Sequence, residues 1–174
     1  MMPRSERDDM TVPPPALRAG RDRETAIGRD TGVEPLFRRQ FSATDRDTRE
    51  TLEILMQVLT RAGVGAEDSS NIELILAEAL NNVAEHAYAE GVGPVELTVT
   101  LQQGGVACTI ADHGRPMPLG VVPSPGLPVI APPDDLPEGG FGWHIIRCLA
   151  TDLTYHRDRL QNRLSLRVPW SGFE

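Results

Sequence analysis

The chain has 174 residues, of which 40% are hydrophobic, and a formal net charge of −8 at pH 7. This length and apolar content suffice for one domain with a proper core. The negative charge argues against a nucleic-acid binder, because neutralising phosphates takes clustered basic residues, so a protein or a small molecule is the expected partner. No apolar run approaches the length of a membrane span, and no signal peptide is visible, so we expect a cytoplasmic protein.

All seventeen basic residues are arginine. A P-loop needs a lysine on the nucleotide phosphates, and eukaryotic-type protein kinases need a strand lysine paired with a helix glutamate. Schiff-base chemistry through a lysine is excluded for the same reason. If the protein transfers phosphate, it must therefore use another kind of nucleotide site.

The first 34 residues form the least structured part of the sequence. They contain six arginines against seven acidic residues, three consecutive prolines at 13–15, and no apolar periodicity. Such a segment cannot bury enough apolar surface to offset its ordering entropy. We expect residues 1–34 to be a disordered tail and residues 35–174 to form the folded domain.

Within that domain, apolar periodicity and glycine or proline breaks predict each element in turn. We expect a strand at 36–42, helices at 44–62 and 67–89, and two strands at 95–101 and 106–111. After a long loop at 116–138 come a helix at 141–150 and two strands at 153–157 and 163–168. The second helix carries one apolar stripe, made of Ile72, Ile75, Leu76, Ala79, Leu80, Val83 and Ala87. Helices and strands segregate instead of alternating, which favours an α+β fold with one mixed sheet and helices on one face.

The long loop has eight prolines between Pro116 and Pro137, too many for a helix or a central strand. Because it precedes a glycine-rich turn, we expect a functional lid at about 116–138. The two cysteines, Cys108 and Cys148, lie in apolar segments and are expected to be buried thiols without a disulfide.

Three motifs carry the candidate chemistry. Glu78 and Asn82 are four residues apart and so share one face of the second helix. Asp112-His113-Gly114 ends a strand, and Gly139-Gly140-Phe141-Gly142 opens a helix whose N-terminal amides can receive phosphate oxygens. Each motif alone has a structural explanation, as a solvated helix edge, a turn and a hinge. Together they are complementary parts of an ATP site.

Residues Glu78 to Tyr88, with the sequence EALNNVAEHAY, closely resemble the N-box of the GHKL ATPase superfamily, and the other two motifs resemble its G1 and G2 boxes. The resemblance implies a Bergerat-type ATP-binding fold, a two-layer α/β sandwich with a mixed, mainly antiparallel sheet. It also implies that Glu78 is the general base and that Asn82 binds Mg²⁺. This assignment suits Mg²⁺, which prefers oxygen ligands and takes few of them from the protein when phosphates supply others.

In the same resemblance, Asp112 accepts a hydrogen bond from the adenine amino group and Gly114 lets the backbone approach the ring. Gly140 and Gly142 belong to the phosphate loop. Pro116 departs from the pattern, which has a second glycine there. Asn162 stands near the position where relatives carry a polar adenine-site residue.

Within the superfamily, the anti-sigma-factor serine/threonine kinases are the most similar. A histidine kinase needs a phosphoacceptor histidine on a dimerisation helix, and no histidine precedes His86. Topoisomerase and chaperone relatives need transducer domains. The resemblance implies a homodimeric kinase that uses Mg-ATP to phosphorylate a small antagonist protein and otherwise sequesters a sigma factor or similar regulator. Two alternatives stay open, a nucleotide-switched binding module without phosphoryl transfer and a kinase domain serving a phosphorelay.

Overall fold

A computed structural model describes residues 34–123 and 141–170 of the chain. Residues 1–33 of the predicted tail, residues 124–138 of the predicted lid, and Gly139 and Gly140 lie outside this part. The helices are α1, α2 and α3, at Asp45–Arg61, Ala66–Asn82 and Phe141–Leu149. The strands β1 to β5 span Phe37–Ser42, Pro94–Gln102, Gly105–Asp112, Thr151–Asp158 and Gln161–Pro169.

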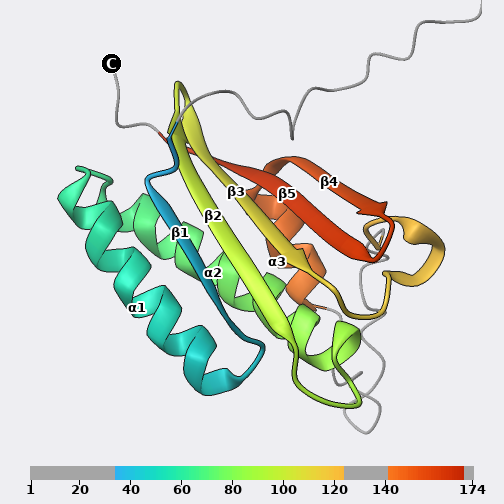
Figure 1. Ribbon diagram of the computed structural model, residues 1–174. Coiled ribbons are helices and arrows are strands. Elements are labelled where there is room, and N and C mark those ends of the chain that lie inside the picture. The colour runs from blue at the N-terminus through green and yellow to red at the C-terminus, as the bar shows by residue number, and fades with distance from the viewer. Residues whose placement is uncertain (1–33, 124–140, 171–174) are drawn as a thin grey trace, which may run out of the picture.

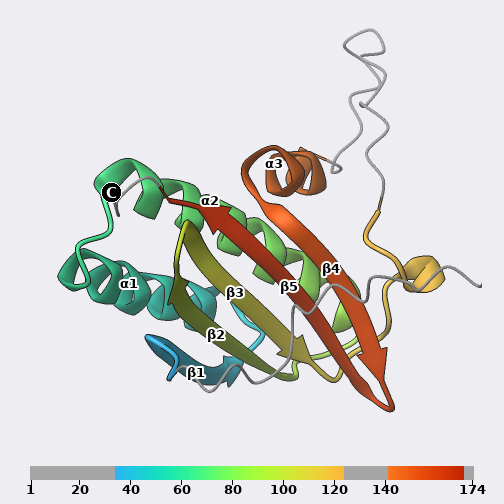
Figure 2. The ribbon, with the colours of Figure 1, turned by 90° about the horizontal axis from the view of Figure 1, so that it is seen from above.

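The strands form one sheet in the order β1-β2-β3-β5-β4, and the helices lie on one face of it (Figures 1 and 2). Every described pairing is antiparallel, so the α+β class is confirmed and the described sheet has no parallel pair. The predicted hairpins, β2 with β3 and β4 with β5, are both present. In the second hairpin, β5 pairs with β3, so that β5 lies between β3 and β4. This pairing places Asn162 directly opposite Asp112.

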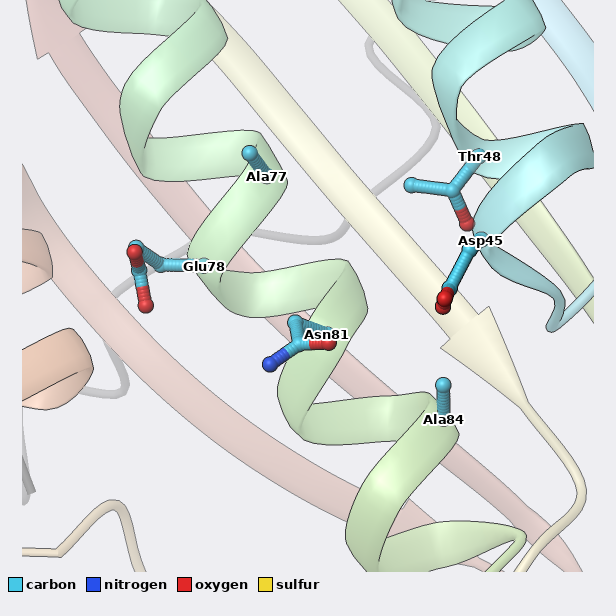
Figure 3. Close-up of a pocket in the computed structure, with 6 residues that line it drawn as sticks. All are labelled: Asp45, Thr48, Ala77, Glu78, Asn81 and Ala84. Carbon is cyan, nitrogen blue, oxygen red and sulfur yellow. The ribbon is translucent and has the colours of Figure 1, made fainter. Parts of the chain in front are cut away.

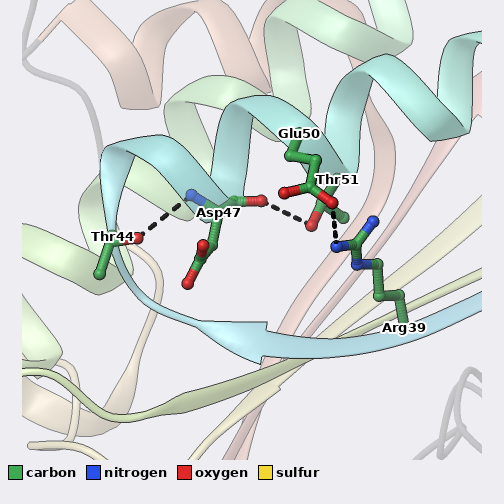
Figure 4. Close-up of polar contacts among 5 residues, drawn as sticks. All are labelled: Arg39, Thr44, Asp47, Glu50 and Thr51. Carbon is green, nitrogen blue, oxygen red and sulfur yellow. Dashed lines mark hydrogen bonds and ion pairs between the residues drawn. The ribbon is translucent and has the colours of Figure 1, made fainter.

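Helix α1 begins at Asp45, one residue after the predicted start, and Thr44 caps it. The Thr44 side chain accepts a hydrogen bond from the Asp47 amide at 3.1 Å, satisfying one of the free donors of the first turn (Figure 4). Arg39 of β1 donates to Glu50 of α1 at 2.8 Å, and this bond and the arginine charge lower the pKa of the Glu50 carboxyl. The contact joins the edge strand to the helix that covers it.

The apolar stripe of the second helix faces the sheet as predicted. Its residues from Ile72 to Leu80 are almost fully buried against the inward side chains of the strands. After Asn82 the helix widens into a π-helical turn, Val83–Ala87, closed by the Tyr88 amide donating to the Val83 carbonyl at 3.1 Å. Such turns are rare and often occur at functional sites. No helix in the described ranges is long and apolar enough to cross a membrane.

The cysteine prediction is wrong for one of the two thiols. Cys108 is buried in β3, but Cys148 is exposed, because it lies two residues from the buried Ile146 of α3 and thus on the opposite side of that helix. Burial raises the pKa of the Cys108 thiol to about 12. Its neutral form is therefore the one that the fold stabilises.

We expect an aromatic disulfide reagent at pH 8 to titrate one thiol in the folded chain, Cys148, and two after denaturation, since the reactive species is the accessible thiolate. Absorbance of the released thiolate measures both numbers. Rapid reaction of two thiols in the folded protein would contradict the burial of Cys108, and Cys148→Ser is the control that should leave no fast-reacting group.

Candidate functional site

A cavity of about 570 Å³ lies where the π-helical turn, the end of β3 and the β4–β5 hairpin meet. This size suits a small-molecule ligand. Its wall is largely apolar, with a few polar side chains facing in. The lining residues include Asn82, Val83, His86, Asp112, Met117, Trp143, Tyr155, Asn162 and Leu164.

Asp112 sits at the end of β3, where it is buried yet reaches the cavity wall. Its Oδ1 accepts two hydrogen bonds, from the Gly114 amide at 2.8 Å and from Nδ2 of Asn162 at 2.7 Å. In the described part of the chain no hydrogen bond reaches Oδ2 of this carboxylate. The fold thus occupies one carboxylate oxygen, and no described residue donates to the other.

Gly114 lies two residues after Asp112, at the point where the chain passes close to the π-helical turn Val83–Ala87. The Arg115 amide donates to the Ala87 carbonyl at 2.9 Å. A Cβ on Gly114 would lie 2.4 Å from that same carbonyl oxygen, a backbone atom that cannot easily move. The glycine predicted from the motif is therefore required by a close backbone approach at the cavity edge.

Asn162 anchors a network that the sequence motifs do not reveal. Its Nδ2 also donates to the Arg115 carbonyl at 3.1 Å, and its Oδ1 accepts from the Tyr155 hydroxyl at 2.7 Å and from Arg157. Tyr155 and Arg157 belong to β4, which lies outside the three motifs, so the motifs do not identify them as site residues. Alternation along the strand could have placed them on the helix side, but not beside Asp112.

The other end of the site contains Glu78, Asn82 and Gly142. Both helix side chains are half-buried, as their position beside the apolar stripe predicts. A Cβ on Gly142 would lie 2.5 Å from Oε2 of Glu78 and 3.7 Å from Nδ2 of Asn82. The start of α3 therefore lies against this face of α2, and a side chain at position 142 would displace the Glu78 carboxylate.

Asn82 and Glu78 border different openings. Asn82 lines the large cavity, whereas Glu78 lines a groove of about 260 Å³ between α1 and α2, together with Asp45, Thr48 and Asn81. Figure 3 shows Asp45 and Thr48 reaching from α1 toward the Asn81 side of α2, while Glu78 extends on the other side, toward α3. Glu78 thus lies at the border of the groove, one helical turn from the cavity-lining Asn82.

The described residues contain no group of three or more His, Cys, Asp or Glu side chains that could hold a metal ion. Mg²⁺ bound with a nucleotide does not need such a group, since phosphates and waters supply most of its ligands. Asn82, whose side chain carries an amide oxygen, lines the cavity, and Gly142 leaves room beside that side chain because it has no Cβ. The residues present fit a magnesium-nucleotide complex.

The antiparallel sheet with helices on one face, and the cavity at the end of α2, define an ATPase domain of the histidine kinase-like type. The family model of the histidine kinase-like ATPase domain matches residues 41–168, and the chain belongs to this family. The resemblance to the GHKL superfamily is thereby confirmed.

Among curated proteins, the chain is similar to the serine-protein kinase RsbW of Bacillus mycoides (strain KBAB4) and of Bacillus cereus (strain AH187). It is 28% identical to each over 103 residues, which are 58% of this chain and 64% of each relative. The chain thus aligns with just under two thirds of these relatives' length. Among solved structures, it resembles the RsbU and RsbW domains of Rv1364c from Mycobacterium tuberculosis, with a TM-score of 0.53 and 17% identity over 77% of this chain and 32% of that chain. This last likeness concerns the fold alone.

Proposed function

We propose that the protein is a Mg-ATP-dependent serine/threonine kinase of the anti-sigma-factor type. It would phosphorylate a small antagonist protein and otherwise sequester a sigma factor or similar regulator. The observation that carries the proposal is the position of Glu78, which lies beside Asn82 and Gly142 and also borders the α1–α2 groove. The similarity to proteins named serine-protein kinase RsbW supports it.

The large cavity would hold the nucleotide base. The free Oδ2 of Asp112 would accept a hydrogen bond from the adenine amino group, and Gly114 would let the backbone approach the ring. Val83, Met117 and Leu164 supply apolar surface around it. Burying the flat, largely apolar base there would contribute most of the binding free energy, and Asp112 would set its orientation.

The phosphates would lie toward α3 and Asn82. The first amides of α3, which begins at Phe141 directly after Gly140, can donate to phosphate oxygens and favour negative charge. Mg²⁺ held through Asn82 would neutralise charge on the β- and γ-phosphates. We propose Gly140 and Gly142 as the phosphate-loop glycines. The close approach of Gly142 to Glu78 supports the proposal for Gly142.

Glu78 would act as the general base. The acceptor serine or threonine of the partner protein would approach on the α3 side of α2, where the Glu78 carboxylate lies, and its hydroxyl oxygen would form a bond to the γ-phosphorus. Its proton would pass to the Glu78 carboxylate as the bond to the ADP oxygen breaks. Phosphoryl transfer depends mainly on positioning and charge stabilisation, and one carboxylate within reach of the hydroxyl is sufficient for the proton.

The proposal is tested by incubating the purified full chain with labelled ATP, Mg²⁺ and candidate antagonist proteins from the same genome. We expect phosphoserine or phosphothreonine on one of them, identified by mass spectrometry. Mg-ATP binding and sigma-factor binding without transfer would favour the nucleotide-switched module, and phosphohistidine on a partner would favour the phosphorelay. Failure to bind any nucleotide would contradict all three functions.

Gly142→Ala should slow transfer by roughly a hundredfold, since displacing a reacting group by about 1 Å can have an effect of that size. The new methyl would push the flexible end of Glu78 away and disturb the backbone little, so we expect an unchanged melting temperature. Gly91→Ala is the matched control, because a Cβ there meets nothing within 4 Å. An unchanged transfer rate in Gly142→Ala would contradict the proposed position of the carboxylate.

A further inference from the structure

We infer that Arg147 of α3 is a positioning residue that holds one wall of the large cavity in place and so sets how long a bound nucleotide stays. The wall is formed by residues 115–123, called here the strap, which follow β3 in the chain. The inference rests on the proposed nucleotide site and concerns the rate at which that site releases its ligand.

The strap borders the cavity over most of its length. It runs from the end of β3 past β4 toward α3 (Figure 2), and its short 3₁₀ turn, Pro118–Gly120, contacts β4. Val122 packs against the edge of the hydrophobic core. The strap residues that line the cavity are Arg115, Pro116, Met117, Pro118 and Pro123. Displacing the strap would therefore open the cavity on this side.

The composition of the strap limits how it can be held. Three of its nine residues are prolines, Pro116, Pro118 and Pro123. Because proline has no backbone N–H, the strap must be held largely through its carbonyl groups, which need donors from other elements. Near β3, Nδ2 of Asn162 donates to the Arg115 carbonyl at 3.1 Å, and the Met117 amide donates to the Tyr155 hydroxyl at 3.1 Å. These two bonds hold only the start of the strap.

The far end of the strap is held by Arg147. Its Nε donates to the Pro123 carbonyl at 3.0 Å, and its Nη2 donates to the Val122 carbonyl at 3.1 Å. The guanidinium group presents its donors in a rigid, planar fork that can bond two neighbouring oxygens at once, which a lysine ammonium does less well. Among the residues that the structure describes, no other side chain hydrogen-bonds to residues 118–123.

The same face of α3 borders the cavity. Trp143 lines the cavity, and Arg147 lies one helical turn further along α3, on the same side of the helix. The first turn of α3 is also the proposed phosphate site. The helix that would bind the phosphates at its start therefore holds the strap at its end. Release of a ligand from a closed site often depends on such an opening step, and the two Arg147 bonds oppose it.

The test measures dissociation of ADP that carries a fluorescent N-methylanthraniloyl group from the full chain with Mg²⁺, by stopped-flow mixing with excess unlabelled ADP. Arg147→Met keeps the length of the side chain but removes its donors. We expect release to be about tenfold faster, since two hydrogen bonds from a charged donor are lost. Arg147→Lys should give an intermediate rate, because its charge is kept without the paired geometry. The melting temperature should not change, because Arg147 is exposed.

Arg61→Met is the matched control. Arg61 is likewise an exposed arginine in the last turn of a helix, so its replacement removes the same favourable interaction with the helix dipole. We expect this variant to release the nucleotide at the wild-type rate. An unchanged rate in Arg147→Met, or an equal increase in Arg61→Met, would overturn the inference.

Hydrogen exchange of the nucleotide-free chain, followed by mass spectrometry, separates the proposed role from a purely structural one. In Arg147→Met the amides of the strap should exchange faster, whereas those of α3 and β4 should keep their wild-type rates, because only the strap is released. Faster exchange throughout α3 would show a structural role and overturn the inference. If the wild type binds no nucleotide, the proposed function fails, and the exchange rates alone decide whether Arg147 holds the strap.

Discussion

Glu78→Gln should slow phosphoryl transfer by at least about a hundredfold while leaving nucleotide binding intact. The amide has the same shape as the carboxylate but cannot take the proton of the attacking hydroxyl, and loss of a general base reduces the rate by about 10²- to 10⁴-fold. The affinity for ATP should stay within roughly threefold of wild type, because the proposed role of Glu78 is exerted in the transition state. Rates of phosphate incorporation into the antagonist and calorimetric binding constants measure the two effects.

The control for this variant is Glu73→Gln, an exposed glutamate on the same helix that should keep full activity. Asn82→Ala offers a contrast, because removal of the proposed Mg²⁺ ligand should weaken Mg-ATP binding as well as transfer. Transfer at the wild-type rate by Glu78→Gln would rule out Glu78 as the base. A nucleotide-switched module that binds a sigma factor without phosphoryl transfer would then be the better explanation.

Asp112→Asn is expected to lose adenine-nucleotide affinity by roughly a hundredfold, about 3 kcal/mol. If the new amide keeps its oxygen toward Asn162 and the Gly114 amide, its NH₂ faces the cavity, where the base amino group is also a donor. Binding then loses a charge-assisted hydrogen bond and gains an unpaired donor. The same change should lower the preference for ADP over inosine diphosphate, which carries a carbonyl in place of the 6-amino group, because an amide donor can bond that carbonyl.

Calorimetry with both nucleotides checks the affinity and the ratio, and thermal unfolding checks that the variant is folded. Asp158→Asn is the matched control, since Asp158 is exposed at the end of β4. Wild-type affinity for ADP in Asp112→Asn would show that this carboxylate does not contact the base. The nucleotide would then have to bind elsewhere or in another orientation.

The positions of the helices and strands could be predicted from the sequence to within a few residues. The apolar stripe from Ile72 to Leu80 and the alternation in β2 are local patterns, which report directly which face of each element is buried. The spacing of Glu78, Asn82 and Asp112 within recognisable motifs likewise allowed these candidate residues to be named. The absence of lysine excluded two other kinds of kinase site without any structure.

Other features depend on how distant segments pack. Local periodicity cannot show that the exposed side of α3 carries Cys148, nor that the helix after Asn82 widens into a π turn. It also cannot show that Glu78 borders the α1–α2 groove while Asn82 faces the cavity, because that division depends on the neighbours of α2. Which side chains are buried depends on how several elements pack together, so it cannot be predicted from one element alone.

The helices and strands, the three motifs and the family resemblance they carry can be predicted without a structure, because each is encoded within a short stretch of chain. The place of β5 between β3 and β4, and with it the contact of Asn162 with Asp112, is visible only in the folded protein. The same is true of the approach of Gly142 on α3 to Glu78 on α2. Such contacts arise from the pairing of strands and the packing of helices far apart in the sequence, which no local pattern specifies.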